Sequence, residues 1–130
     1  MSAERPPMQQ PAKNPARIDI LAVGHPAVTP INRRLYRALA RLGWSVELVI
    51  PTHIPWSSDV AQPAQAGDPP IHLLKPLGDN TRTWSFEGLD ALLDRRRPRI
   101  VYLENQPDTM MAWSIGGWCR KNGAVLIANS

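Results

Sequence analysis

The stretch that decides the fold covers residues 17–51 and reads RIDILAVGHPAVTPINRRLYRALARLGWSVELVIP. Residues 18–23 are almost continuously apolar, which is typical of a strand buried on both faces of a parallel sheet. A break at 24–26 ends this strand, and a second apolar run follows at 46–50. A helical pattern lies between the two runs. The stretch therefore predicts a strand, a turn, a helix and a parallel strand, joined by a right-handed crossover.

The helix between these strands is predicted from its ends and from its apolar spacing. Thr29 stands at the expected N-cap and Pro30 at the first helical position, where the missing N–H costs nothing. Gly43 is expected to end the helix in the left-handed conformation. Apolar residues at three- and four-residue spacing are expected to face the sheet, with arginines on the remaining surface. The apolar set is Ile31, Leu35, Ala38, Leu39 and Leu42, and the basic set is Arg33, Arg34, Arg37 and Arg41.

Three more apolar runs are expected to complete the sheet, at 71–74, 99–103 and 124–128. Helical patterns at 86–97 and 107–123 precede the last two runs. Alternating strands and helices predict an α/β fold, a doubly wound, Rossmann-like parallel sheet with three α/β/α layers and strand order 3-2-1-4-5. The apolar side chains of the last helix, which are expected to be core, include Met110, Met111, Trp113, Ile115, Trp118 and Cys119.

Length and charge narrow the possible classes of protein. A chain of 130 residues forms one domain at most. Its formal net charge is +4 at pH 7, but the basic residues are scattered along the chain. A nucleic-acid site favours a continuous basic stripe with a groove-entering motif, so nucleic acid is not expected as a partner. Peripheral contact with an anionic membrane surface is a secondary expectation.

The single cysteine and the N-terminal residues bear on location. Cys119 has no partner for an internal disulfide and belongs to no set of metal ligands, so a reducing cytoplasm and no bound metal are expected. No run approaches the ~20 apolar residues that a membrane-spanning helix needs. Residues 1–16 are rich in proline and lack the apolar core of a signal peptide, so we expect a disordered tail before a domain at 17–130.

Ligands of open α/β sheets bind beyond the carboxyl ends of the strands, where the strand order reverses. This rule selects the loops after the first and fourth predicted strands. His25 is the first candidate, because a neutral imidazole there can accept a proton or bind a hydroxyl or phosphate. The alternative is that His25 packs against or caps the turn. Glu104 can orient a sugar hydroxyl, or it can be a solvated carboxylate at the end of a strand.

Three asparagines are further candidates for the same crevice. Asn105 follows Glu104, Asn32 lies in the first helical turn, and Asn80 belongs to a polar loop at 78–83 that can contact a phosphate. Each of these asparagines is also an ordinary turn or surface residue. The dinucleotide-binding glycine fingerprint and the phosphate-loop lysine motif are both missing from the sequence.

Two segments resemble the opening of the family 4 glycosyltransferases, which have a GT-B fold of two Rossmann-like domains. The first is residues 17–51. The second is RPRIVYLENQP at 97–107, followed by an apolar helix and NGAVLI at 122–127, and it is similar to that family's "rPDivhleeeP" strand and the elements after it. The resemblance implies that residues 17–130 are the acceptor-side, N-terminal domain, truncated at its C-terminal end. In that reading His25 is the candidate catalytic residue, the acceptor cleft holds Glu104, Asn105, Asn32 and Asn80, and Gly24 is a weak donor contact.

The resemblance implies transfer of a hexosyl group from a nucleotide sugar, as co-substrate, to a hydroxyl acceptor that is a sugar or lipid-linked, with no bound cofactor or metal. The family's glutamate pair, which contacts the donor, lies in a C-terminal domain and has no counterpart here. The family's glycine-rich loop is reduced to Gly24, His25 and Pro26. We therefore expect the 130-residue chain alone to be inactive. The alternative is a stand-alone, flavodoxin-like ligand-binding module.

Overall fold

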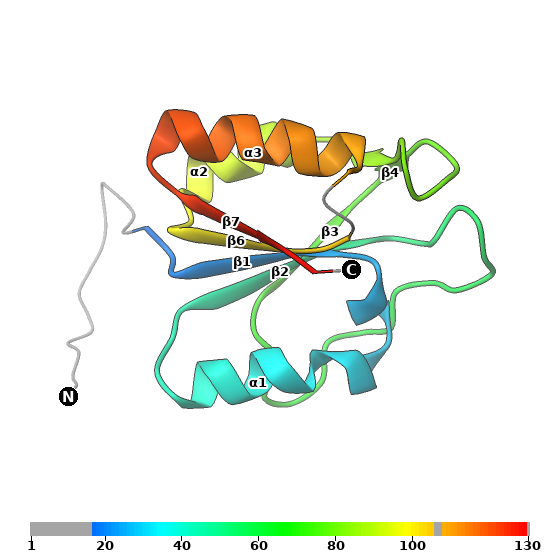
Figure 1. Ribbon diagram of the computed structural model, residues 1–130. Helices are drawn as coiled ribbons and strands as arrows, with labels where there is room; N and C mark the ends of the chain where they lie inside the picture. Colours follow the sequence, from blue (N-terminus) through cyan, green and yellow to red (C-terminus); the bar gives the residue numbers. More distant parts are fainter. Residues whose placement is uncertain (1–16, 106–107, 130) are drawn as a thin grey trace.

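A computed structural model describes residues 17–105 and 108–129 (Figure 1). Five parallel strands form the central sheet in the order β3-β2-β1-β6-β7. Because β6 and β7 are the predicted fourth and fifth strands, the doubly wound α/β fold and its order are confirmed. The tail predicted at 1–16 lies outside the described residues. The strands are β1 (Ile20–Gly24), β2 (Val46–Pro51), β3 (Ile71–Leu74), β6 (Ile100–Glu104) and β7 (Val125–Ala128).

The helices cover the two faces of the sheet unequally. Figure 1 shows α1 (Arg34–Arg41) on one face, with α2 (Leu89–Arg96) and α3 (Met110–Asn122) on the other. Short elements form two of the connections. Two 3-10 turns, η1 (Pro26–Val28) and η2 (Pro30–Arg33), lead from β1 into α1, and a small antiparallel pair, β4 (Pro76–Leu77) and β5 (Ser85–Phe86), leads from β3 toward α2.

The apolar strands supply two cores, one on each face of the sheet. Leu21 and Val23 of β1 are buried in the core under α2 and α3, while Ala22 between them is buried in the core under α1. In β2, Val49 is buried in the core under α2 and α3, and Leu48 is buried in the core under α1. Full burial of such a side chain contributes roughly 1.5–3 kcal/mol. Burial on both faces explains why these strands read as continuous apolar runs.

The first helix begins later than predicted. Thr29 and Pro30 start the turn η2, the Thr29 side chain makes no cap hydrogen bond, and α1 begins only at Arg34. Pro26 and Pro30 each stand at the start of a 3-10 turn. Because proline fixes φ and restricts the residue before it, the chain winds through two short turns before the α-helix starts.

The helix also turns a different side toward the sheet. Tyr36 is the buried residue of α1, whereas Ile31, Leu35 and Leu42 are 58%, 51% and 76% exposed. The prediction that the apolar spacing marks the packed face was therefore wrong for these three residues. Of the apolar residues predicted to face the sheet, only Leu39 packs against the core under α1, and Leu39 is partly buried.

Arg33 was predicted on the helix surface, but its side chain is fully buried. Its guanidinium donates to two carbonyls of η1 at 2.7 and 3.2 Å and to the carbonyls of residues 62 and 63 at 2.7 and 3.1 Å. It also pairs with Asp68 at 2.9 Å, as does Arg37 at 2.7 Å. Burial alone raises the pKa of the Asp68 carboxyl, but hydrogen bonds from a backbone N–H and both arginines hold it below its usual range. Arg33 thus joins the turn after β1 to the long loop after β2.

Two later elements also depart from the predicted boundaries. Ser85 and Phe86, expected to open a helix, form strand β5, and α2 starts at Leu89 after a left-handed Gly88. The last helix was expected from residue 107, whereas α3 starts at Met110 with Thr109 as its N-cap. Of its apolar side chains, Met111, Ile115 and Cys119 are buried as predicted, but Met110 and Trp113 are exposed and Trp118 is partly buried.

The buried guanidinium gives a direct stability test. Arg33→Lys is expected to lower the free energy of unfolding by about 3 kcal/mol, because an ammonium group cannot replace the donors that reach four carbonyls and a carboxylate. Arg34→Lys is the matched control, since Arg34 is an exposed neighbour and its replacement should change stability by less than about 0.5 kcal/mol. Urea denaturation measures both variants. Equal, small effects would contradict the role given to Arg33.

Candidate functional site

The site is built where the strand order reverses, between β1 and β6. These strands pair in parallel along their whole length, and Gly24 at the end of β1 lies opposite Glu104 at the end of β6. A Cβ added at Gly24 would lie 2.9 Å from the Cβ of Glu104, closer than real side chains approach. Glycine is therefore required for the two strand ends to meet. Gly24 thus has a structural role at this point, and the donor contact at Gly24 stays a prediction.

A pocket of about 380 Å³ opens beyond these two strand ends. It brings together the loop after β1, the loop after β6, the loop that follows β4 and the end of β7. This is the place where ligands bind in open α/β sheets. The lining residues are His25, Pro26, Thr81, Arg82, Glu104, Asn105, Thr109 and Asn129.

His25 lines the pocket with its ring held among aromatic side chains. The imidazole lies edge-on to Trp56, with ring centroids 5.3 Å apart, and to Trp84, with centroids 5.9 Å apart. Trp84 is fully buried, and its indole N–H has no hydrogen-bond partner in the described part of the chain. Burial lowers the pKa of His25, so the ring is neutral at neutral pH. A neutral imidazole with one basic nitrogen can accept a hydrogen bond or a proton.

Glu104 is a partly buried carboxylate on the opposite wall. Burial raises the pKa of its carboxyl, and a hydrogen bond from the Tyr36 hydroxyl opposes that rise only in part. The pKa of Tyr36 is in turn raised, first by burial and then by the bond to Glu104. Tyr36 comes from α1, and its ring also contacts Tyr102 of β6, with centroids 6.3 Å apart. Helix α1 therefore orients Glu104 from below the sheet.

The three predicted asparagines have different positions. Asn105 is buried and lines the pocket, as predicted. Asn32 does not line it, because its side-chain amide donates to the carbonyl of Pro26 at 2.9 Å and braces the turn. Asn80 is also outside the lining, since its side-chain oxygen accepts the backbone N–H groups of Arg82 and residue 83 at 3.0 and 3.1 Å. Asn32 and Asn80 thus shape the loops around the pocket.

The structure adds pocket residues that the sequence did not single out strongly. Arg82 comes from the predicted polar loop, while Thr109 caps α3 and Asn129 follows β7. The Asn129 amide donates to the Tyr102 hydroxyl at 2.9 Å. The position of Asn129 at the end of the fifth strand was a usable signal under the strand-end rule. Nothing in the sequence signals Thr109, because its role depends on where α3 starts.

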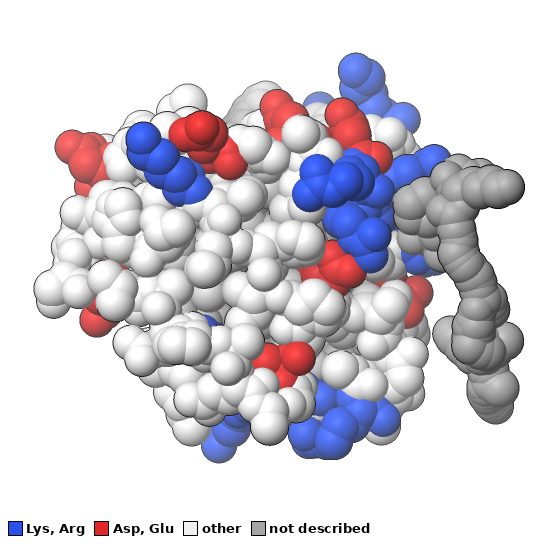
Figure 2. Space-filling view, turned by 180° about the vertical axis from the view of Figure 1, so that it is seen from behind, with Lys and Arg blue, Asp and Glu red and all other residues white. Residues whose placement is uncertain are grey.

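The basic side chains are divided between separate parts of the surface. On the face shown in Figure 2, Lys and Arg side chains form separate groups, toward α1 and near the end of α2, with acidic side chains between them.

Within residues 17–105 and 108–129, no three His, Cys, Asp or Glu side chains are placed to share a metal ion. Over the same residues, no helix has both the length and the apolar character needed to cross a bilayer.

Comparison with protein-family models, with curated proteins and with solved structures gave no match to this chain. The chemistry of the site is therefore argued from its own residues. The pocket combines a neutral imidazole, a carboxylate with a raised pKa, one guanidinium and two asparagines. Such a set can bind and orient a hydroxyl-bearing ligand, because each group offers a hydrogen-bond donor or acceptor.

The raised pKa of Glu104 has a consequence for stability. A carboxyl that holds its proton more tightly when folded contributes its full stability below the ordinary value of 4.5 and loses it as pH rises through the folded pKa. Glu104→Gln should therefore melt at a higher temperature than the native chain at pH 7, with the difference shrinking toward pH 4. Thermal melting from pH 4 to pH 8 measures this, with Glu87→Gln, at an exposed position, as control. Parallel curves for the native and Glu104→Gln chains would refute it.

Proposed function

We propose that this chain is the acceptor-side, N-terminal part of a glycosyltransferase that moves a sugar from a nucleotide-sugar donor to a hydroxyl acceptor. The observation that carries the proposal is the meeting of a neutral His25 and a partly buried Glu104 in one pocket at the reversal of strand order. The reaction class comes from the resemblance of residues 17–51 and 97–107 to the family 4 glycosyltransferases.

His25 and Glu104 have complementary roles toward an acceptor hydroxyl. The basic nitrogen of His25 accepts the hydroxyl proton as the oxygen forms its bond to the anomeric carbon of the donor sugar. The bond from that carbon to the donor phosphate breaks, and the nucleoside diphosphate leaves with the bonding electrons. Glu104 accepts a hydrogen bond from a second hydroxyl of the acceptor and favours the protonated imidazole by its negative charge. Asn105 and Arg82 hold neighbouring hydroxyls.

The donor is assigned to a C-terminal GT-B domain outside this sequence. Gly24 is not among the residues that line the pocket, and Arg82 is the one cationic side chain among the described residues that do. A nucleoside diphosphate needs more positive charge or more free backbone N–H groups than the described residues that line the pocket supply. The proposed location is the cytoplasm, at the inner face of a membrane where the acceptor is lipid-linked.

Replacing His25 tests the pocket. The native chain should bind methyl glycosides of glucose, galactose, mannose or N-acetylglucosamine weakly, and His25→Ala should weaken that binding at least fivefold. His25→Gln should keep part of it, because an amide oxygen also accepts a hydrogen bond. Saturation-transfer NMR measures the binding. His53→Ala is the matched control, since His53 is exposed and outside the pocket lining.

Three results would count against the proposal. One is equal sugar binding by the native and His25→Ala chains. Another is UDP-glucose or GDP-mannose binding as tightly as the methyl glycosides, because the donor is assigned elsewhere. The third is a purified protein with flavin absorbance, which would establish the flavodoxin-like alternative. Sequencing the DNA after the Ser130 codon gives independent support if a second Rossmann-like domain follows in frame.

A further inference from the structure

The pocket at the strand ends continues into a second hollow along the start of α3. This hollow has a volume of about 590 Å³. Arg82 and Thr109 line both hollows, so the two are adjacent, and together they are called the groove. The other lining residues of the second hollow are Thr83, Asp108, Met110, Trp113 and Ser114.

An exposed indole forms one wall of the second hollow. Trp113 is 76% exposed, and Met110, one turn before it on α3, is 60% exposed, whereas Met111 and Ile115 between and beyond them are buried. Leaving two large apolar side chains in water forgoes roughly 1.5–3 kcal/mol each. An indole combines an apolar ring with one polar N–H group, so it is well suited to contact a ligand that has both apolar and polar surface.

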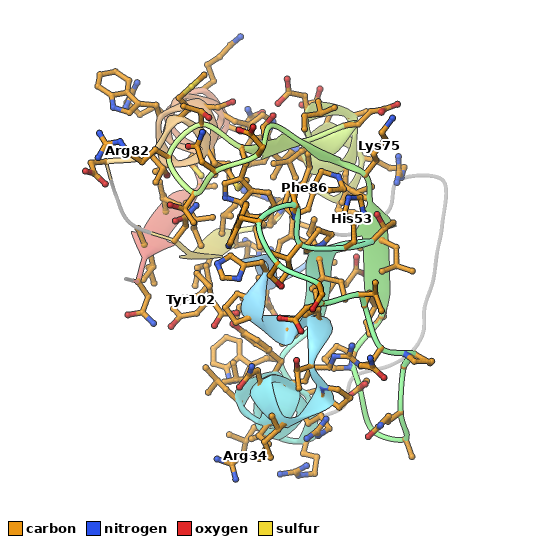
Figure 3. The ribbon with its side chains drawn as sticks, turned by 90° about the vertical axis from the view of Figure 1, so that its right-hand side faces the viewer. Arg34, His53, Lys75, Arg82, Phe86 and Tyr102 are labelled. Atoms are coloured by element: carbon orange, nitrogen blue, oxygen red, sulfur yellow. The ribbon has the colours of Figure 1, made fainter. Side chains whose placement is uncertain are left out.

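The groove has a fixed backbone and two mostly exposed charged side chains, Arg82 and Asp108. The N–H of Met110 donates to the carbonyl of Arg82 at 3.0 Å, so the loop at 80–84 is tied to the start of α3. Figure 3 shows the Arg82 side chain at the outer edge of the molecule, on the side of β7. Its contact with Asp108 is 3.4 Å long, and both side chains are mostly exposed. Such surface pairs contribute little, so both groups remain available to a ligand.

We propose that this groove binds an acceptor of at least two sugar units, with the second ring stacked on Trp113. This inference rests on the proposed function. A pyranose ring carries C–H groups on its faces, which suit the electron-rich face of an indole, and hydroxyls on its rim, which suit Arg82 and Asp108.

A nucleotide is a poorer occupant of the same groove, although nucleobases also stack on aromatic rings. The N–H groups of Met110 and Ala112 at the start of α3 already donate to Arg82 and Thr109. These two N–H groups are therefore occupied, which leaves less of this helix end to bind a phosphate. The carboxylate of Asp108 adds repulsion toward a phosphate.

Indole NMR signals test the inference on the full chain. Maltose, cellobiose, lactose and chitobiose are titrated beside their monosaccharides, and at least one disaccharide should shift the Trp113 indole signal. Its affinity should fall about tenfold in Trp113→Ala and less in Trp113→Phe. Trp44→Ala is the matched control, because Trp44 is 50% exposed but lies outside the groove, and it should change nothing.

The outcomes separate this inference from the proposed function. Sugars that shift the NMR signals of His25 and Glu104 but bind the Trp113→Ala chain as tightly as the native chain would overturn the stacking role and leave the acceptor pocket in place. Sugars that shift neither the Trp113 signal nor the signals of His25 and Glu104 would overturn both the stacking role and the acceptor pocket. A Trp113 signal that responds to UMP and to no disaccharide would assign the groove to a nucleotide and overturn the inference.

A second surface lies on the other face of the sheet. Helix α1 packs below β1 and β2, and Figure 3 shows no described helix below β6 and β7 on that side, where the labelled Tyr102 projects. Val125 and Ile127 of β7 pair in register with Ile100 and Tyr102 and are 57% and 45% exposed. The apolar face of β7 is therefore uncovered in the described part of the chain.

This sheet surface is continuous with the exposed apolar stripe of α1. The rings of Tyr36 and Tyr102 connect the helix to β6. The stripe and the strand residues, Ile31, Leu35, Leu42, Val125 and Ile127, together expose on the order of 500 Å², which matches the largest, often functional, patch of a typical monomer and is more than half of what one partner contributes to a standard interface.

We infer that a second copy of this chain covers the surface. The surface has a step, with a helix projecting beside a flat strand face. A flat membrane touches only the outer side of the helix, whereas a copy related by a two-fold axis sets its own α1 on β6 and β7. The two apolar parts thus complement each other, as a two-fold interface requires.

Sedimentation equilibrium and disulfide trapping test this interface. The native chain should dimerise at micromolar concentration, and Leu35→Glu or Ile127→Glu should each make it monomeric, whereas Trp113→Glu on the other face should not. A Leu35→Cys chain mixed with an Ile127→Cys chain should form a mixed disulfide. A native chain that stays monomeric, or a dimer that survives both substitutions, would overturn the inference. A monomer that binds phosphatidylglycerol vesicles would assign the face to a membrane instead.

Discussion

The close approach of two strand ends is the constraint on which the candidate site depends. Gly24 and Glu104 are paired in register, and no side chain larger than hydrogen fits at position 24 without displacing Glu104. Beyond this shared point, α1 follows β1 on one face of the sheet, and α3 follows β6 on the other (Figure 1). The elements that follow the two central strands therefore lie on opposite faces and leave a pocket between them, which is the general reason that such sheets bind ligands there.

A second interaction connects the fold to the chemistry of His25. Arg33 holds the long loop after β2 through the carbonyls of residues 62 and 63 and through Asp68. The same loop carries Trp56, whose ring packs edge-on against His25. Because the aromatic contacts remove water from the imidazole, its pKa falls and the neutral, proton-accepting form prevails. A buried arginine outside the pocket lining thus supports the protonation state of the histidine inside it.

The sequence predicted the parts of the structure that depend on local pattern. Five apolar runs gave five strands in the predicted order, and the strand-end rule located His25, Glu104 and Asn105 in one pocket. Two other kinds of feature escaped it. Arg33 reads as a surface residue because three of its five acceptors, the carbonyls of residues 62 and 63 and the Asp68 carboxylate, come from a segment distant in sequence. The exposure of Leu35 and Trp113 depends on how far each helix is rotated, which 3-10 turns and a Thr109 cap decide.

The central claim is that the pocket between the ends of β1 and β6 binds the sugar acceptor. The most direct measurement is a map of backbone and side-chain NMR shifts over the whole chain as a methyl glycoside or a disaccharide is added. The largest shifts should gather at His25, Arg82, Glu104 and Asn105, where the pocket is lined. Shifts gathered at the opposite ends of the strands, or spread evenly over the surface, would contradict the claim.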